Sequence, residues 1–288
     1  MNDGFLVVDK EGGFTSHDVV ALARKQLGTK KVGHAGTLDP MATGVLVLGV
    51  GIGTKLLNFI VDGRKGYEAT IRLGASTTTD DKEGEVLESF DVSKITEAQI
   101  KAELAKFSGK VLQRPSSVSA IKIDGKRAHE RVRAGESVEI PAREVEIFEL
   151  EIKSISNNQE FIDVEIVVHC SAGTYIRSIA RDLGQALNVG GHLIKLNRIL
   201  VAPFELKDAA KLPDAKLISI SDGLAKILPS RNLTLDEERE LFFGRPISES
   251  KDEVTAAYKN NGDFAGLLTN KEQAGKILSF PSLVNVKE

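Results

Sequence analysis

One aspartate stands in a loop whose composition suits the presentation of a reactive carboxylate. Asp39 lies in the turn-rich stretch GHAGTLDPMATG (33–44), which leads into an apolar run, VLVLGV, at 45–50. The following Pro40 restricts Asp39 to extended backbone, and glycines permit tight turns on either side. A carboxylate directed from such a loop into a cleft is partly desolvated, which makes it more basic or nucleophilic, and a nearby cation keeps it ionised. An Asp-Pro pair alone is also a common structural turn, so the wider motif must decide between the two interpretations.

A second segment, SAGTYIRS (171–178), offers groups that match such a carboxylate. Arg177 is a candidate counter-ion, and Thr174 is predicted to cap the helix that carries Tyr175 and Arg177. Tyr67 stands at the start of a predicted strand, where an aromatic ring can stack on an everted nucleobase with about 1–3 kcal/mol. The chain has three tyrosines and no tryptophan. Two tyrosines in candidate site segments are therefore notable, although either ring alone would more often be a packing residue.

Other motif interpretations fail on spacing. The glycines of LGVGIG (48–53) lack the third-glycine spacing of a dinucleotide-binding loop. The neighbours Ser16, His17 and Asp18 point in different directions and cannot form a hydrolase triad. The five histidines show no metal-ligand spacing, and the single cysteine, Cys170, excludes an internal disulfide and a multi-cysteine zinc site. The sequence therefore predicts no metal, flavin or nicotinamide cofactor, and Cys170 is interpreted as a buried strand residue.

The charge distribution bears on nucleic-acid binding. The 288 residues carry a net charge of -3, which alone argues against a nucleic-acid binder. Residues 109–133, however, contain seven Lys and Arg against Asp124 and Glu130, a local balance of +5. Phosphate contacts need only such a local patch. A solvated basic face is the competing interpretation, and the sequence leaves both open.

The elements that must position these groups alternate irregularly between strands and helices. Apolar and alternating patterns predict strands at 5–9, 45–50, 67–74, 138–155, 161–170 and 192–204. Apolar spacing and capping residues predict helices at 16–27, 51–60, 97–107 and 174–187, the first capped by Thr15 or Ser16 and ended by Gly28. TTTDDKEGE (77–85) is interpreted as a polar loop. Long, antiparallel-looking strands with interspersed helices indicate an α+β fold.

The length predicts one sizeable domain followed by a small second one. A composition shift near 228–234 introduces a β-rich segment, 230–288, with a helix that Gly244 ends. No apolar run approaches the ~18 residues of a membrane span, and the acidic start MNDGFLVVDK lacks the pattern of a signal peptide. With a single, unpaired cysteine, we expect a cytoplasmic protein without membrane contact.

Several stretches together resemble the bacterial tRNA pseudouridine-55 synthase family. They are DKEGGFTSHDVV, KVGHAGTLDPMATGVLVLGVGIGTKL, KGYEATIRLG, RPSSVSAIKIDGKRAHERVRAG, and CSAGTYIRSIARDLG with HLIKLNR. The similarity runs over roughly residues 3–205, in the order and spacing of the family. It implies a cofactor-free isomerase that converts uridine to pseudouridine at position 55 in the T-arm loop of tRNA.

The resemblance also implies roles for individual residues. It places the catalytic carboxylate at Asp39, the arginine paired with it at Arg177, and the base-stacking tyrosine, with a suggested part in proton removal from C5, at Tyr67. The residues that bind the substrate would be His34, Tyr175, Leu196 and Lys10, together with Lys126 and Arg127 in an insertion at about 109–144 that clamps the T loop.

The implied architecture has two parts. The catalytic domain, 1–229, would contain a mixed, mainly antiparallel sheet with flanking helices and a central cleft, and 230–288 would be a small PUA-like RNA-binding domain. The expected partner is tRNA, and the expected state is a monomer without metal. The chain departs from the family pattern at Glu11, Val118, His129 and Asn197, which bears on the RNA clamp and on one phosphate contact.

Two questions stay open at the level of sequence. An alternative function is a non-catalytic tRNA-binding or folding protein that uses the same cleft, although the intact catalytic residues argue against it. The route is also unassigned, because Asp39 can attack C1′, add to the base, or remove the 2′ proton.

Overall fold

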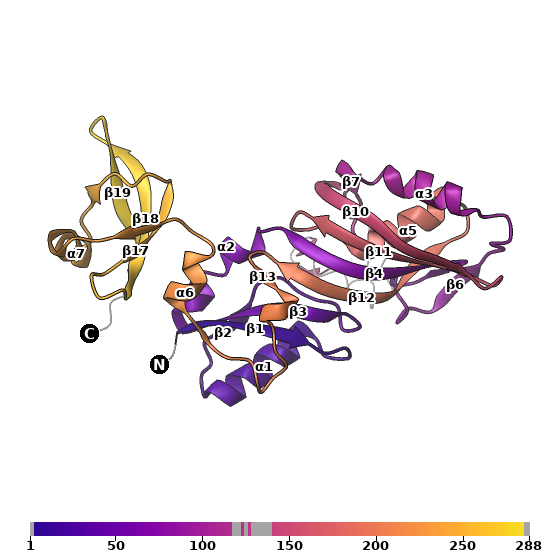
Figure 1. Ribbon diagram of the computed structural model, residues 1–288, viewed down its shortest axis with the longest axis horizontal. Coiled ribbons are helices and arrows are strands. Elements are labelled where there is room, and N and C mark those ends of the chain that lie inside the picture. The colour runs from indigo at the N-terminus through magenta and orange to yellow at the C-terminus, as the bar shows by residue number, and fades with distance from the viewer. Residues whose placement is uncertain (1–2, 117–121, 124–125, 128–139, 285–288) are drawn as a thin grey trace.

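Two large sheets, two short two-stranded ladders and the flanking helices make up the computed structural model, which describes residues 3–116, 122–123, 126–127 and 140–284 (Figure 1). The larger sheet has the order β14-β1-β3-β12-β4-β11-β10-β7, with β13 beside β12 and β2 beside β3. Its strands are β1 (Gly4–Lys10), β2 (Val32–His34), β3 (Thr43–Val50), β4 (Lys65–Leu73), β7 (Gly109–Gln113), β10 (Arg143–Asn157), β11 (Ile162–Cys170), β12 (Gly191–Val201), β13 (Phe204–Glu205) and β14 (Ile218–Ser219). Of its strand pairs, β12 with β3 is parallel and the others are antiparallel. The predicted mixed, mainly antiparallel α+β fold is confirmed.

The helices follow local signals in the sequence. They are α1 (Ser16–Leu27), α2 (Asn58–Val61), α3 (Glu97–Ala105), α5 (Ile176–Ala186), α6 (Ile220–Ala225) and α7 (Leu235–Phe242), with 3-10 turns η1 (Gly51–Lys55) and η2 (Leu206–Asp208). Thr15 caps α1 by accepting from the backbone N–H of Asp18, and Gly28 ends it with φ 62. The helix predicted at 51–60 is instead η1 followed by α2, because the two glycines in η1 disfavour a continuous helix.

The helix that carries Arg177 starts later than predicted. α5 begins at Ile176, and its N-cap residue is Tyr175, which makes no side-chain cap. The hydroxyl of Thr174 donates instead to the carbonyl of Ser171 at 3.0 Å. The prediction that Thr174 caps this helix is therefore wrong, because a nearby carbonyl in the preceding turn takes its hydroxyl.

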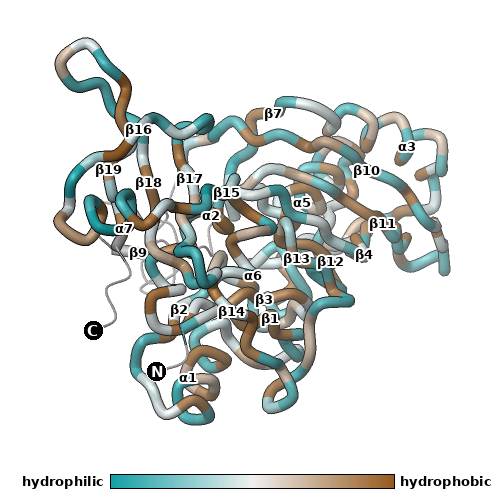
Figure 2. Tube along the Cα trace, turned by 60° about the vertical axis from the view of Figure 1, so that its left-hand side comes forward, coloured by the Kyte–Doolittle hydropathy of each residue, from teal (hydrophilic) through white to brown (hydrophobic). Residues whose placement is uncertain are grey.

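Strands β1 and β3 are apolar along their length because both of their faces are buried. Successive side chains alternate between faces, so Leu6 and Val8 join one core cluster while Phe5 and Val7 join another. Apolar residues of α1, α3 and α5 complete the first cluster. Hydrophobic segments run through the strands and alternate with hydrophilic turns (Figure 2).

Strand β4 brings Tyr67 to the face that α5 covers. Tyr67, Ile71 and Leu73 occupy alternate positions and belong to the same cluster as Leu183 of α5. After β4 the chain forms a hairpin of β5 (Ala75–Thr77) and β6 (Val86–Ser89). The loop of this hairpin, predicted as a polar loop, returns to the larger sheet through a bridge between Asp81 and Leu193 of β12.

The second sheet is formed by the C-terminal part of the chain and has the order β15-β17-β18-β19-β16. Its strands are β15 (Ser230–Asn232), β16 (Ile247–Ser248), β17 (Val254–Tyr258), β18 (Phe264–Gln273) and β19 (Lys276–Val284). Figure 1 shows it at one end of the long axis, with α7 beside it. Tyr258 and Phe264 lie in the same core cluster as Phe5 and Val7, so the two sheets share apolar packing.

The predicted insertion at about 109–144 is described only in part. Its backbone includes β7 and a two-stranded ladder of β8 (Lys122–Ile123) with β9 (Lys126–Arg127). The side chains of Lys126 and Arg127, and the departures Val118 and His129, lie outside what the structure describes. Within the described residues, no helix has the length and apolar character needed to cross a membrane.

Candidate functional site

The loop that carries Asp39 joins β2 to β3, and one buried arginine of β12 binds backbone carbonyls within it and near the start of β3. Arg198 of β12, 1% exposed, donates to the carbonyls of Gly36 at 3.1 Å, Thr37 at 3.3 Å and Val45 at 2.7 Å. A Cβ at Gly44 would collide with the backbone of Arg198, and Gly44 has φ 99. Both ends of the loop are thus fixed to β12. The sequence reasoning missed Arg198, since its role depends on the pairing of β12 with β3 and β4.

Asp39 and Arg177 meet in a two-point ion pair. Arg177 Nε lies 3.0 Å from Asp39 Oδ2, and Nη2 donates to Oδ1 at 3.1 Å. The arginine side chain is 6% exposed and the aspartate side chain 30% exposed. A bidentate pair of this kind fixes the orientation of the carboxylate as well as its charge. The structure therefore brings the two predicted partners together, with the carboxylate on the solvent side.

A second carboxylate, which the sequence reasoning missed, occupies the remaining side of the same guanidinium. Asp81 Oδ2 lies 3.3 Å from Arg177 Nη1, and the Asp81 side chain is 4% exposed. Its other oxygen accepts from Thr79 Oγ1 at 2.6 Å and from the backbone N–H of Glu83 at 3.0 Å. The Thr- and Asp-rich composition of 77–85 is typical of a turn, and it carries no signal that Asp81 would be buried against Arg177.

Different groups around Asp39 shift the pKa of its carboxyl in opposite directions. Burial raises the pKa of the Asp39 carboxyl above its ordinary value, Arg177 lowers it, and the negative charge of Asp81 raises it again. The more distant cations Lys10 and Arg198 lower it. Arg177 therefore offsets part of the desolvation, and the carboxylate is left more basic than one in water.

Tyr67 lies beside this pair and is tied to the same buried arginine. Its side chain is buried, and in the ladder between β4 and β12 it stands opposite Arg198. Burial raises the pKa of Tyr67, while a hydrogen bond with Arg198 lowers it. The net shift is upward, so the phenol keeps its proton at neutral pH.

Lys10 supports the loop from the other side. Its ammonium donates to the carbonyls of Phe14 at 2.7 Å, Glu11 at 2.9 Å and Pro40 at 3.2 Å, and the residue is 1% exposed. Burial lowers its pKa to about 8. Its three N–H donors all have backbone partners, so Lys10 supports the Asp39–Pro40 turn, and its predicted contact with substrate stays a prediction.

Three other predicted substrate-binding residues stand on the segments that carry Asp39, Arg177 and Arg198. Tyr175 immediately precedes α5, and Leu196 of β12 is buried in the core cluster that includes Tyr67. His34 ends β2, is partly buried, and packs edge-on against His17 with 5.4 Å between the ring centroids. Burial lowers the pKa of His34, so its ring is neutral at pH 7.

The side chain of Asn197 forms hydrogen bonds to residues of two neighbouring strands. Its amide donates to Glu68 Oε2 at 3.2 Å, and its carbonyl oxygen accepts from Thr43 Oγ1 at 3.0 Å. Asn197 thereby bridges β4 and the start of β3. The side chain of Asn197 is therefore used within the sheet.

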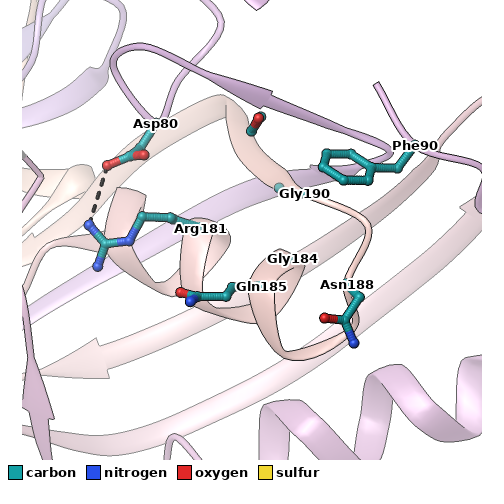
Figure 3. Close-up of a pocket in the computed structure, with 9 residues that line it drawn as sticks. Asp80, Phe90, Arg181, Gly184, Gln185, Asn188 and Gly190 are labelled. Atoms are coloured by element: carbon teal, nitrogen blue, oxygen red, sulfur yellow. Dashed lines mark hydrogen bonds and ion pairs between the residues drawn. The ribbon is translucent and has the colours of Figure 1, made fainter. Parts of the chain in front are cut away.

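A cavity of about 330 Å³ lies farther along α5, beyond Arg177 (Figure 3). Asp80 and Arg181, whose Oδ2 and Nη1 atoms are 3.5 Å apart, line it together with Phe90 and residues at the end of α5. Asp39, Tyr67 and Tyr175 are not among its lining residues. In the part of the chain that the structure describes, no group of three His, Cys, Asp or Glu is placed to hold a metal ion.

Comparison with known proteins agrees with the motifs at this site. The family model described as "TruB family pseudouridylate synthase (N terminal domain)" matches residues 24–176, a range that includes Asp39, Tyr67, Asp81 and Tyr175.

Related sequences and one solved structure extend the likeness to most of the chain. A protein of Corynebacterium efficiens named tRNA pseudouridine synthase B is 53% identical, covering 85% of this chain and 84% of its own. Proteins of the same name from Corynebacterium glutamicum and Leifsonia xyli are 48% and 44% identical and cover 96% and 98% of this chain and 94% and 98% of their own. A chain of an H/ACA RNP bound to a substrate RNA containing 2′-deoxyuridine superposes with a TM-score of 0.71 at 21% identity, covering 99% of this chain and 85% of its own. At 21% identity, this superposition supports the fold alone.

Proposed function

The chain belongs to the TruB family of pseudouridylate synthases, and on that basis we propose that it isomerises uridine to pseudouridine at position 55 in the T-arm loop of tRNA. The relatives that share about half of its residues are named tRNA pseudouridine synthase B. The observation that carries the proposal is the two-point ion pair between Asp39 of the GHAGTLDPMATG loop and Arg177 of α5.

The reaction needs one positioned carboxylate and no redox step. The C1′–N1 bond of uridine breaks, the uracil turns, and a C1′–C5 bond forms, after which C5 loses its proton and N1 carries one. The target base must first leave the stack, at a cost of a few kcal/mol. Attack of Asp39 on C1′, addition of Asp39 to the base and removal of the 2′ proton by Asp39 all begin from the ionised carboxylate. A raised pKa makes that carboxylate a better nucleophile or base in each route.

Arg177 and Asp81 prepare this carboxylate for the reaction. Arg177 holds both oxygens of Asp39, and Asp81 fixes the third nitrogen of the guanidinium. An arrangement set before the substrate arrives needs little reorganisation during the reaction. We therefore assign Asp39 as the catalytic carboxylate, Arg177 as its partner, and Asp81 as the residue that positions Arg177.

The aromatic and apolar residues near Asp39 suit the uracil itself. In this proposal Tyr67 stacks on the everted base, Tyr175 and Leu196 line the pocket, and His34 holds the displaced nucleotides. The raised pKa of Tyr67 favours stacking and hydrogen bonding by the neutral phenol over direct proton removal by a phenolate.

RNA binding outside the pocket would use two further regions. We propose that the insertion at about 109–144 clamps the T loop with basic residues such as Lys126 and Arg127. We also propose that 1–229 forms the catalytic domain and 230–288 a PUA-like RNA-binding domain, since an independent sheet begins at Ser230. The protein would act as a monomer.

Mapping of pseudouridine in cellular tRNA tests this function. Cells that lack the protein should lose pseudouridine at position 55 and keep it elsewhere in tRNA. The intact gene should restore it, and the Asp39→Asn variant should not. Persistence of pseudouridine 55 in the deleted strain would contradict the proposal.

A further inference from the structure

Two residues at the root of the 109–144 insertion converge on Tyr175. Gln113 is the last residue of β7 and Arg143 the first of β10, and they are direct partners in the antiparallel ladder. The chain leaves the sheet at one of them and returns at the other. Both side chains reach the turn that precedes α5.

The side-chain amide of Gln113 binds the backbone of Tyr175 through both its nitrogen and its oxygen. Its Nε2 donates to the carbonyl of Tyr175 at 3.0 Å, and its Oε1 accepts from the backbone N–H of Tyr175 at 2.8 Å. The residue is 3% exposed. Tyr175 makes no side-chain cap on α5, and the Gln113 amide fixes the backbone of this N-cap residue through its N–H and its carbonyl.

Arg143 fixes the ring of the same tyrosine. Its guanidinium carbon lies 5.1 Å from the centroid of the Tyr175 ring, within the range of a cation–π contact. Its Nη2 donates to the carbonyl of Gly173 at 2.5 Å. Gly173 has φ 83, a conformation that favours glycine, so Arg143 also holds the turn that directs Tyr175.

The neighbouring root residues contact the segments around Arg177. The carbonyl of Arg114 accepts from Ser178 Oγ at 3.0 Å and from Arg181 Nη2 at 2.7 Å. Ser116 Oγ donates at 3.3 Å to the carbonyl of Thr79, which also accepts from Arg177. The root of the insertion is therefore packed onto the turn and helix that carry Tyr175 and Arg177.

We propose that Gln113 and Arg143 are positioning residues that set Tyr175 against the uracil. The inference rests on the proposed function, in which Tyr175 lines the uracil pocket. Gln113 fixes where the backbone of Tyr175 lies, and Arg143 fixes the plane of its ring. RNA affinity comes mostly from phosphate contacts, so the loss of either side chain disorders the bound base without releasing the RNA.

Single-turnover release of tritium from a T-arm RNA labelled at C5 of the target uridine, with binding of the same RNA measured in parallel, tests this inference. Gln113→Ala should lower the rate at saturating enzyme about 10- to 100-fold, with an RNA Kd within about threefold of wild type. Arg143→Lys keeps the charge but not the planar stack, and should lower the rate by a smaller factor. Arg64→Lys is the matched control, because Arg64 stacks on Phe148 at 4.2 Å, and it should keep the wild-type rate.

A double-mutant comparison separates positioning of the ring from general support of the fold. In a Tyr175→Leu background, Gln113→Ala and Arg143→Lys should lower the rate much less than in wild type, because the ring they position is gone. Wild-type rates in both variants, or equal losses in both backgrounds, would overturn the inference. If Gln113→Ala does not fold, Arg143→Lys alone decides by the same criteria. Failure of the wild type to release tritium would instead count against the proposed function.

Discussion

Arg177 donates to Asp81 through Nη1 at 3.3 Å while its Nε and Nη2 hold Asp39. One guanidinium thus bridges a partly exposed carboxylate that can meet substrate and a buried one that cannot. The buried partner fixes the arginine in place, and its negative charge raises the pKa of Asp39. Both effects can be tested separately, one through the rate and the other through its pH dependence.

Asp81→Asn should reduce the rate and shift its pH dependence. The shape of the side chain is kept, but Arg177 loses an ionic partner, and we expect the rate to fall about 10- to 100-fold. The acidic limb of the profile reports ionisation of Asp39, whose raised pKa places it above the ~3.9 of an ordinary aspartate. Because the charge of Asp81 raises that pKa, its removal should move the limb to lower pH. A limb that stays in place or moves upward in single-turnover measurements would contradict the assigned coupling.

Arg177→Lys should lose most activity although it keeps a positive charge. A lysine cannot contact both oxygens of Asp39 and also reach Asp81, so the carboxylate loses its fixed orientation. We expect a decrease of at least about 100-fold in single-turnover rate. The control is Arg72→Lys, since Arg72 of β4 forms a similar two-point pair with Asp163 of β11, at 2.8 and 2.7 Å. Similar losses in the two variants would show that the effect is general.

Arg198→Met should destabilise the protein and disturb the catalytic loop. The substitution leaves the carbonyls of Gly36, Thr37 and Val45 without their donor, and each buried unsatisfied group costs about 1–3 kcal/mol. Water, relaxation and the removal of a desolvated charge recover part of this cost, so we expect the free energy of unfolding to fall by roughly 2–4 kcal/mol. Urea denaturation measures it, and an unchanged midpoint would show that Arg198 does not anchor the loop.

Local signals in the sequence were sufficient where the structure depends on near neighbours. Thr15 begins and Gly28 ends α1 as predicted, because capping acts within one turn of helix. Asp81 and Arg198 could not be found this way. Their roles arise only when distant segments meet in the fold, Asp81 with Arg177 of α5 and Arg198 with the loop before β3. A polar loop or a strand arginine looks the same in sequence whether it is buried or exposed.

The same limit applies to roles within the site. The ammonium of Lys10 donates to three backbone carbonyls, a supporting role that its place in the sequence does not indicate. Thr174 was expected to cap α5, yet its hydroxyl binds Ser171. The hydroxyl of Thr174 can bind either the start of α5 or a carbonyl in the preceding turn, and the geometry of that turn favours the carbonyl.

The basic part of the insertion leads to a prediction about salt. If Lys126 and Arg127 contact phosphates, replacing both with alanine should weaken binding of a T-arm RNA and reduce the slope of log K against log salt by about one to two charges. Replacing Lys101 and Lys106 of α3, which pair with Glu97 and Glu103, should leave the slope unchanged. An unchanged slope in the first variant would mean that the segment is a solvated surface.

Release of tritium from C5 of the target uridine in a T-arm transcript tests the central assignment most directly, because formation of the C1′–C5 bond displaces that label. The wild-type protein should release one tritium for each pseudouridine formed, and Asp39→Asn, which removes the carboxylate but keeps its shape, should release none while still binding the RNA. Equal release by the two proteins would contradict the role of Asp39, and tight binding without release by the wild type would make the protein a tRNA-binding protein.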